Sequence, residues 1–412
     1  MSARLQSYAE FAGQEVLDHL HQLARFLKGR TVVHVNSTRV GGGVAEILAR
    51  LVPLKRELGL DVSWEVVEGD ADFFAMTKRL HNGLQGNTVN LPRRLIDSYE
   101  QINRANAERL RSRLEEADFV FIHDPQPAPL LGLCPKRKGL WVWRCHIDVS
   151  RPNRAVWKLL REHVKAYDAS IFSLAAFAQP LPHPQYLVPP SIDPLSEKNL
   201  PLEESEVREV SERFGLDPDR PVVAQVSRFD RFKDPVGVIR AFRLVKAHTT
   251  AQLVLAGGTA TDDPEGEEVL QEVREESGND PDVHILLLPA DAHRTINALQ
   301  RRADVILQKS VREGFGLTVT EALWKSRPVV GGRTGGITLQ VVDRHTGFLV
   351  STPEGAALRT RYLLRRPGER REMGEKGRRF VKDHFLLTRH LREYLTLMVG
   401  IQHASSERIE VA

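Results

Sequence analysis

The chain has 412 residues, of which 41% are hydrophobic and 27% charged, and its formal net charge is +4. This length accommodates two or three domains, each with a sizeable core. The small, dispersed charge argues against nucleic acid as a partner, and the lack of a long apolar run argues against a membrane partner. The first residues do not resemble a secretory signal, and two cysteines are too few for a disulfide framework, so we expect a cytoplasmic protein.

Strand-like apolar runs alternate with helical patterns along the first half of the chain, which is typical of a doubly wound parallel sheet. The first strand leads through Gly41, Gly42 and Gly43 into a helix, and glycines there would let the backbone approach a phosphate. A tight turn without a ligand is the alternative interpretation. The predicted strands span residues 31–36, 61–67, 118–123 and 140–145, and the apolar face of the helix consists of Val44, Ile47, Leu48, Leu51, Leu54 and Leu58.

Polar side chains gather where the third and fourth predicted strands end. Arg144, His146 and Asp148 occupy alternate positions, so they project from one side of the strand exit. A lone histidine at a strand end is more often structural, but its two polar neighbours favour a functional role for His146. His123 and Asp124 form a second pair of this kind, which we assign to the same ligand-binding edge of the sheet.

A proline-rich polar stretch, residues 180–219, separates these elements from a second series of strands and helices. Arg228 and Lys233 follow the first strand of this second half, at the carboxyl end where ligands bind in open α/β sheets. Arginine grips a phosphate through two N–H groups and lysine adds a mobile charge, so the pair could neutralise a diphosphate. Two solvated surface charges are the alternative. The second set of strands is predicted at residues 221–226, 251–256, 283–288, 303–308 and 327–331.

Two carboxylates, Glu313 and Glu321, flank a glycine-containing turn that follows the strand at residues 303–308 and enters a helix. The N–H groups at the helix start, from Gly316, Leu317 and Thr318, suit an anion. Carboxylates bind sugar hydroxyls, so this combination suggests a nucleotide sugar. Thr318 and Glu321 also fit a capping box, in which the glutamate merely closes the start of the helix.

These segments resemble the retaining glycosyltransferases of the GT-B fold, a family that includes sucrose-phosphate synthases and bacterial glycogen synthases. The resemblance covers most of the chain and is most specific in Ser-Arg-Phe-Asp-x-x-Lys at 227–233 together with Glu-x7-Glu at 313–321. Within the family, the trehalose glycosyltransferring synthases are similar at residues 34–38, 41–48, 123–127, 143–148 and 189–198. Trehalose phosphorylases share several of these strings but are usually longer chains.

The resemblance implies two Rossmann-like α/β domains that face a cleft. Residues 1–195 would form the acceptor-side domain, and residues 196–385 would bind the nucleotide sugar. The last segment, residues 386–412, would pack back on the first domain as a helix. The implied activity is reversible transfer of glucose from a nucleoside diphosphate to free glucose, which yields α,α-trehalose. A trehalose phosphorylase, or another sugar or sugar-phosphate glucosyltransferase of this fold, is the alternative.

The same resemblance implies a role for each candidate residue. Arg228 and Lys233 would hold the diphosphate and Glu321 the ribose. Glu313 would contact the donor glucose, and His146 would face that glucose from the first domain. The residues assigned to the acceptor are His123, Asp124, Arg144 and Asp148. The Gly41–Gly43 turn would touch the diphosphate. No protein nucleophile is then required.

The partners implied are small molecules: nucleoside-diphosphate glucose, glucose and trehalose. We expect no tightly bound cofactor and no protein metal site, although Mg²⁺ is compatible with a diphosphate substrate. The sequence leaves open the preferred base, the physiological direction and the oligomeric state, a homodimer included.

Two other enzyme classes fit less well. A nicotinamide-dependent oxidoreductase would use Glu68 for the ribose, but Glu46 replaces the last glycine of the dinucleotide fingerprint and would repel a pyrophosphate. A glycosidase would need Glu313 and Glu321 to flank one bond. If Glu321 is the third residue of its helix, its side chain is directed to the helix start, which does not suit that geometry.

Overall fold

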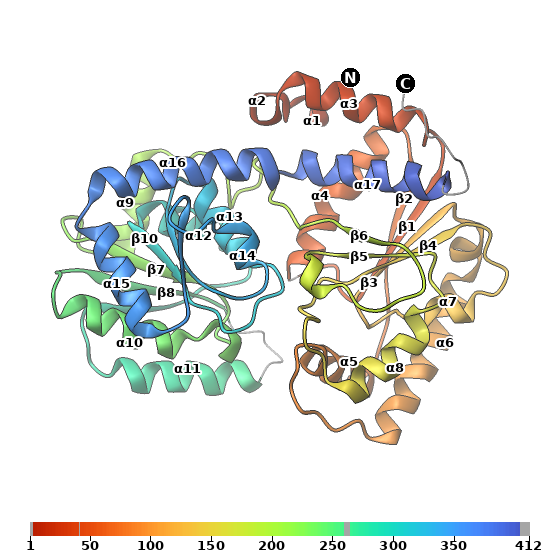
Figure 1. Cartoon of the computed structure of the whole chain (residues 1–412), viewed down its shortest axis with the longest axis horizontal. Helices are drawn as coiled ribbons and strands as arrows, with labels where there is room; N and C mark the ends of the chain where they lie inside the picture. Colours follow the sequence, from red (N-terminus) through yellow and green to blue (C-terminus); the bar gives the residue numbers. More distant parts are fainter. Residues whose placement is uncertain (1–2, 41, 259–263, 404–412) are drawn as a thin grey trace. The chain divides into compact units, whose positions relative to one another are not determined.

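The computed structural model describes residues 3–40, 42–258 and 264–403. The chain forms two compact units, of which the first comprises the described residues up to Ser191 together with those from Leu387 onward (Figure 1). The second unit runs from Ile192 to Leu386. Each unit is built on a six-stranded parallel sheet, which confirms the predicted α/β class.

The sheet of the first unit has the order β2-β1-β3-β4-β5-β6. Because β2 and β3 lie on opposite sides of β1, the strand order reverses between β1 and β3. Ligands of open α/β sheets bind at the carboxyl ends of strands beside such a reversal. The strands are β1 (Thr31–Asn36), β2 (Asp61–Val66), β3 (Phe119–His123), β4 (Leu140–Arg144), β5 (Ala169–Phe172) and β6 (Gln185–Leu187).

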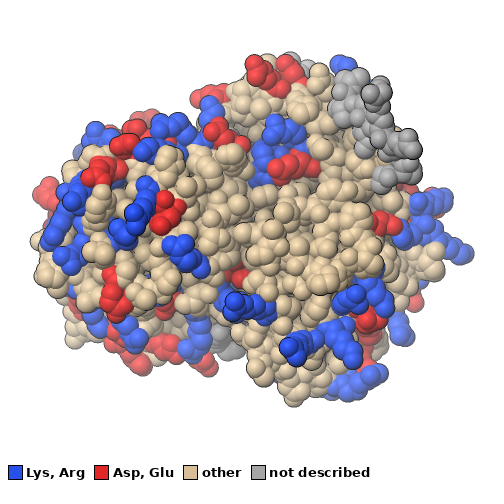
Figure 2. Space-filling model, in the orientation of Figure 1, with Lys and Arg blue, Asp and Glu red and all other residues tan. Residues whose placement is uncertain are grey.

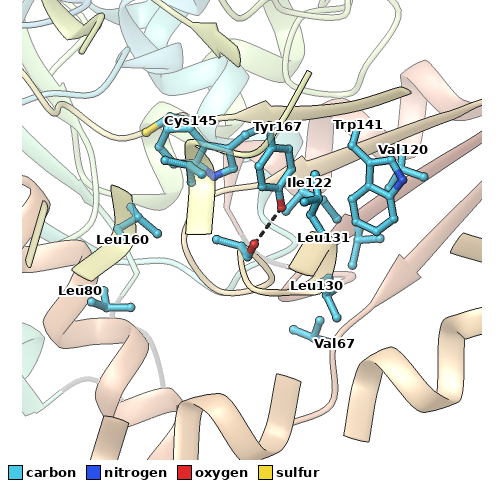
Figure 3. Packing of buried hydrophobic residues seen from close by; sticks show 14 of the residues in the cluster. Val67, Leu80, Val120, Ile122, Leu130, Leu131, Trp141, Cys145, Leu160 and Tyr167 are labelled. Atoms are coloured by element: carbon cyan, nitrogen blue, oxygen red, sulfur yellow. Dashed lines mark hydrogen bonds between the residues drawn. The ribbon is translucent and has the colours of Figure 1, made fainter. Parts of the chain in front are cut away.

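Helices pack on this sheet and bury its apolar side chains. One cluster holds Trp141, Cys145 and Tyr167, and the Tyr167 hydroxyl is satisfied by the Ala128 carbonyl at 2.9 Å (Figure 3). The helices are α1 (Ala3–Gln6), α2 (Ala9–Ala12), α3 (Gln14–Arg25), α4 (Gly43–Glu57), α5 (Ala71–Leu84), α6 (Arg93–Glu116), α7 (Leu130–Leu133), α8 (Arg154–Val164), the 3₁₀ turn η1 (Ala175–Phe177) and α17 (Leu387–Gln402).

The last helix, α17, belongs to the first unit although the whole second unit precedes it in the chain. It packs against α3 and α4 (Figure 1). The residues of its apolar face are all buried: Leu387, Leu391, Tyr394, Leu395 and Met398. Burial of an apolar stripe is the main source of stability for a surface helix, which explains why α17 docks here.

The sheet of the second unit has the order β12-β11-β10-β7-β8-β9, and its reversal lies between β7 and β10. Its strands are β7 (Val222–Val226), β8 (Gln252–Gly257), β9 (Val283–Leu287), β10 (Val305–Gln308), β11 (Val329–Gly332) and β12 (Gly347–Val350). Its helices are α9 (Glu204–Arg213), η2 (Arg231–Lys233), α10 (Pro235–Lys246), α11 (Pro264–Ser277), α12 (His293–Arg302), α13 (Leu317–Trp324), α14 (Ile337–Gln340), α15 (Pro353–Leu364) and α16 (Pro367–His384).

Three strands lie outside the predicted strands, and one helix, α9, lies in the stretch predicted to separate the two domains. Strands β5, β6 and β12 have three or four residues each, too few to show an alternating pattern, and they are recruited by backbone pairing with a neighbour. The polar stretch at residues 180–219 contains β6 and α9, so it is an ordered connection. Helix α9 buries only Ser211 among its residues, which explains the missing apolar signal.

Among the described helices none is long and apolar enough to span a membrane. Basic and acidic side chains are interspersed over the face drawn in Figure 2.

Candidate functional site

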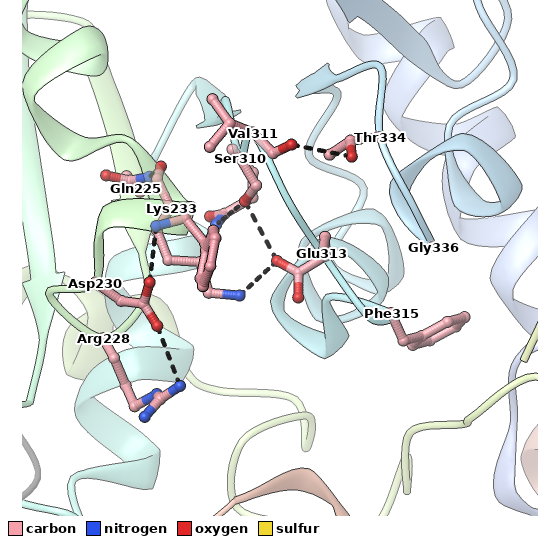
Figure 4. Close-up of polar contacts among 12 residues, drawn as sticks. Gln225, Arg228, Asp230, Lys233, Ser310, Val311, Glu313, Phe315, Thr334 and Gly336 are labelled. Carbon is pink, nitrogen blue, oxygen red and sulfur yellow. Dashed lines mark hydrogen bonds and ion pairs between the residues drawn. The ribbon is translucent and has the colours of Figure 1, made fainter. Parts of the chain in front are cut away.

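The second unit brings together two loops at the reversal of its sheet, one after β7 and one after β10 (Figure 4). The Val311 N–H donates to the Phe232 carbonyl at 2.8 Å, which joins the loops through their backbones. The Gln225 side-chain amide, from within β7, donates to the Lys233 carbonyl at 2.8 Å. These bonds set Lys233 opposite the loop that carries Glu313.

Lys233 and Glu313 form an ion pair in which Nζ lies 2.6 Å from Oε2, with side chains 18% and 8% exposed (Figure 4). The Ser310 hydroxyl donates to the same oxygen at 3.2 Å. Gly335 packs directly against the backbone of this loop. A Cβ at position 335 would lie 1.7 Å from the Glu313 carbonyl oxygen, so only glycine fits there. Because the Lys233–Glu313 pair is largely buried and Ser310 also donates to Glu313, both charged side chains are held in position.

Arg228 lies at the edge of the same cluster with its side chain 60% exposed. Its Nη2 is 3.3 Å from Asp230 Oδ2 (Figure 4). The other oxygen of Asp230 accepts from the Phe232 N–H at 2.7 Å and caps η2. Asp230 therefore links the orientation of Arg228 to that of the lysine loop, a role that sequence reasoning did not assign.

Helix α13 begins after Gly316, whose φ of +86° favours glycine. Gly316 is the N-cap, no side chain caps the helix, and Glu321 is its fifth residue. The capping-box interpretation of Thr318 and Glu321 is therefore wrong, and so is the prediction that Glu321 is the third helical residue. Because αL geometry at Gly316 starts the helix, the first turn lies two residues earlier than a Thr318 cap would place it.

The Glu321 side chain is buried, with the residue 3% exposed, and its Oε2 has no hydrogen-bond partner within the described part of the chain. Lys325 is also buried, but its Nζ donates to the Glu321 carbonyl and to Asn199 Oδ1, each at 3.1 Å. Burial lowers the pKa of Lys325 to about 7. A buried carboxylate oxygen without a donor is costly, so it marks a place where a ligand hydroxyl would be stabilising.

The first unit holds a second cluster of polar side chains, which lies at the reversal between β1 and β3. His123 Nδ1 lies 3.0 Å from His146 Nε2, and His123 Nε2 lies 3.0 Å from His34 Nδ1. Lys55 Nζ, from α4, lies 2.9 Å from His34 Nε2. Burial lowers the pKa of His123 to about 3 and those of His34 and His146 well below their usual value, so all three rings are neutral at pH 7.

Sequence reasoning missed Lys55 and His34, although a signal for each exists. Lys55 follows Leu51 by four residues and Leu48 by seven, so helical periodicity places it on the buried face of α4. His34 lies two residues after Val32 on β1, so the two side chains share one face of the strand. The His34 ring stacks on the Phe121 ring, with 4.9 Å between the ring centres. The polar character of both side chains concealed their place in the core.

The remaining predicted residues of the first unit lie at or just after the ends of β3 and β4. Asp124 Oδ1 accepts from the His146 N–H at 2.7 Å, and burial raises the pKa of Asp124 to about 7. Arg144 is fully buried and donates to the Ser173 hydroxyl at 3.3 Å, while its Nε and Nη1 have no partner among the residues described. Asp148 accepts from the Ser150 N–H at 3.0 Å, in the turn that follows β4.

The glycine turn is described only in part, because Gly41 lies outside the described residues. Gly42 has a φ of +85° and is the N-cap of α4, which begins at Gly43. No side chain caps α4, so backbone N–H groups at its start are left for solvent or a ligand. Within the described residues, no cluster of three or more His, Cys, Asp or Glu side chains could hold a metal ion.

Comparisons with known proteins identify both units. Residues 34–179 match the family described as trehalose synthase, N-terminal domain, and residues 206–380 match glycosyl transferases group 1. A trehalose synthase of Thermococcus litoralis is 48% identical over 96% of this chain and 96% of its own length. A trehalose phosphorylase of Pleurotus pulmonarius is 26% identical, over 86% of this chain and 55% of its own length.

The fold is shared with a solved sucrose-phosphate synthase of Thermosynechococcus elongatus. The TM-score is 0.72 at 17% identity, and the match covers 92% of this chain and 100% of the other. The family matches and the 48% identity along almost the whole length agree with this fold. The chain therefore belongs to the trehalose synthase family and is a glycosyltransferase of the GT-B fold.

Proposed function

We propose that this enzyme reversibly transfers glucose from a nucleoside diphosphate to the anomeric hydroxyl of free glucose, which yields α,α-trehalose. The observation that carries the proposal is the cluster at the sheet reversal of the second unit. There the Lys233–Glu313 pair lies near the start of a helix that contains Glu321, whose buried carboxylate oxygen has no partner among the described residues. A cation for phosphate and carboxylates for hydroxyls match the two ends of a nucleotide sugar.

Each side chain of the second unit would then take one part of the donor. Arg228 and Lys233 would bind the diphosphate, assisted by the N–H groups of Gly316, Leu317 and Thr318. Glu321 would accept hydrogen bonds from the ribose diol. Glu313 would bind a hydroxyl of the glucose and keep the lysine oriented toward the leaving group.

The first unit would supply the groups for the sugars. His146 would contact the donor glucose, and His123, Asp124, Arg144 and Asp148 would define the acceptor side. Two side-chain nitrogens of Arg144, Nε and Nη1, lack partners among the described residues. They support this role, because a buried guanidinium with unused donors favours a hydroxyl-rich ligand. The Gly41–Gly43 turn would contact the diphosphate.

The reaction breaks the bond between the glucose anomeric carbon and the diphosphate oxygen and forms a bond to the acceptor hydroxyl oxygen on the same face. The acceptor proton passes to the departing diphosphate. Catalysis then rests on positioning and on stabilisation of negative charge by Arg228 and Lys233. Mg²⁺ would enter, if at all, with the diphosphate rather than in a protein site.

The test is a set of parallel incubations with one enzyme preparation. Glucose is supplied with ADP-, UDP- or GDP-glucose, and trehalose formation is measured, which also identifies the preferred base. In the reverse direction, trehalose is supplied with nucleoside diphosphate, with inorganic phosphate, or with buffer alone. Consumption that requires nucleoside diphosphate supports the proposal. Consumption with phosphate alone would identify a phosphorylase, and glucose release in buffer would identify a hydrolase.

A further inference from the structure

Four polar side chains of the first unit form a hydrogen-bonded row, Lys55–His34–His123–His146. Its three contacts measure 2.9, 3.0 and 3.0 Å and connect α4 to the end of β4 through β1 and β3. Lys55, His34 and His123 are each at most 2% exposed. Bulk solvent therefore does not reach these three side chains, and the rings hydrogen-bond to their neighbours in the row.

When it is protonated, the first member of the row, Lys55, determines the direction of every hydrogen bond in the row. Burial lowers the pKa of Lys55 to about 7. In the protonated form the ammonium has three donors and no acceptor, so Nζ can only donate to His34 Nε2. A neutral imidazole has one N–H, so His34 must carry it on Nδ1 and donate to His123 Nε2. By the same step, His123 carries its hydrogen on Nδ1 and donates to His146 Nε2.

Two aromatic faces favour the donating direction at Lys55. Nζ lies 4.9 Å from the ring centre of Phe121 and 4.5 Å from that of Tyr394, which α17 supplies. The negative face of a ring attracts an ammonium or an N–H group and repels a nitrogen lone pair. A reversed row would need His34 to donate to a lone pair of Lys55 between these rings.

We propose that Lys55 is a positioning residue that, acting through His34 and His123, holds His146 in the tautomer with its hydrogen on Nδ1. The ring nitrogen of His146 not engaged by His123 is then a hydrogen-bond donor. In consequence, and here the inference rests on the proposed function, His146 would donate to a sugar oxygen and could not act as a base toward a hydroxyl. A neighbour that sets the tautomer of a histidine can control activity without touching substrate.

The direct test is ¹⁵N NMR of the ligand-free enzyme labelled at histidine, recorded at a pH below the pKa of Lys55 of about 7. The His146 signals are assigned by their loss in His146→Gln. Protonated and unprotonated ring nitrogens resonate in separate regions, so the tautomer is read without reference to activity. We expect Nδ1 of His146 to be protonated and Nε2 not. A protonated Nε2, or an equal mixture of both tautomers, would overturn the inference.

Lys55→Met tests the cause, because methionine is unbranched, only one atom shorter than lysine and compatible with the two aromatic rings, but cannot donate a hydrogen bond. We expect a mixture of His146 tautomers and a fall in kcat of about 10- to 100-fold, with little change in the KM for the donor. An unchanged tautomer in a folded variant would contradict the assignment to Lys55. If this variant does not fold, the wild-type spectrum still decides.

The matched control is Leu54→Ala, which removes a fully buried side chain next to Lys55 on α4 and leaves the polar row intact. It should lower stability and keep the wild-type tautomer. A mixture in this variant too would show that packing, rather than the lysine donor, determines the tautomer. Wild-type enzyme that has the expected tautomer but forms no trehalose would reject the proposed function and leave this inference standing.

Discussion

At the residue scale, Glu321 can be tested cleanly because it does not cap its helix. Glu321→Gln retains the size of the side chain and should leave α13 intact, since Gly316 is the N-cap. We expect weaker donor binding, with the KM of nucleoside-diphosphate glucose raised about tenfold, because hydrogen bonds to an ionised group contribute about 1.5–3 kcal/mol. Steady-state kinetics and thermal unfolding check the two halves of the prediction.

Glu209→Gln, which changes an exposed glutamate of α9, is the matched control for this substitution and should behave as wild type. If the Glu321 variant is folded and has an unchanged donor KM and rate, the carboxylate does not bind the ribose.

Alanine substitutions of Arg228 and Lys233 should lower activity by similar amounts but should differ in their effect on stability. Both alanine variants should lose on the order of 10²-fold in kcat/KM, because each removes a positive charge from the leaving group. Arg228 is 60% exposed, so its loss should leave the unfolding temperature nearly unchanged. Lys233→Ala leaves the buried Glu313 without its cation and should cost about 3–5 kcal/mol as well.

Activity and urea unfolding of the two variants, measured side by side, check this difference. Near-normal activity in both would place the diphosphate elsewhere. Equal stability of the two variants would show that the Lys233–Glu313 pair is not buried in solution.

At the element scale, α17 is an integral part of the first unit. Its side chains Tyr394 and His390 are buried, and Tyr394 lies over Lys55. Removal of the chain from Leu386 onward should expose the apolar surface of α3 and α4 that α17 covers. We expect loss of solubility and of activity, measured by sedimentation of the expressed protein and by trehalose formation. A soluble, fully active truncation would show that the helix is dispensable.

The histidine-rich core of the same unit predicts a defined pH dependence of stability. The pKa values of His34, His123, His146 and His390 are all lowered, mainly by burial, while an unfolded histidine titrates near 6.5. Below that pH the unfolded chain binds more protons than the folded one, so the free energy of unfolding falls as pH falls. Asp124, whose pKa burial raises to about 7, acts in the opposite direction and offsets one of the four.

Urea unfolding at several pH values, followed by tryptophan fluorescence, checks this prediction. His390→Leu removes one titrating group and should reduce the pH slope of unfolding free energy below pH 6.5 by up to about 1.4 kcal/mol per pH unit. The exposed residue His19, changed to Gln, provides the control. An identical slope in wild type and His390→Leu would contradict the assignment.

At the scale of the whole molecule, the α/β class and the two parallel sheets follow from local patterns. Strand and helix periodicities are properties of short segments, so β1, β7 and α4 could be predicted without any tertiary contact. The candidate groups after β7 and β10 could be predicted for a related reason. Parallel strands share one carboxyl edge, and polar residues that follow them along the chain therefore converge in space.

Only the tertiary structure determines which distant side chains and strands pair with one another. The pairing of Lys233 with Glu313, 80 residues apart, depends on β7 and β10 being neighbours, and strand order is not a local property. The start of α13 depends on the left-handed backbone at Gly316, and the short strands β5, β6 and β12 depend on edges that other strands offer. Helical periodicity could predict Lys55 on the buried face of α4. The histidines of its row, His34 and His123, come from β1 and β3, and long-range packing determines which buried polar groups meet.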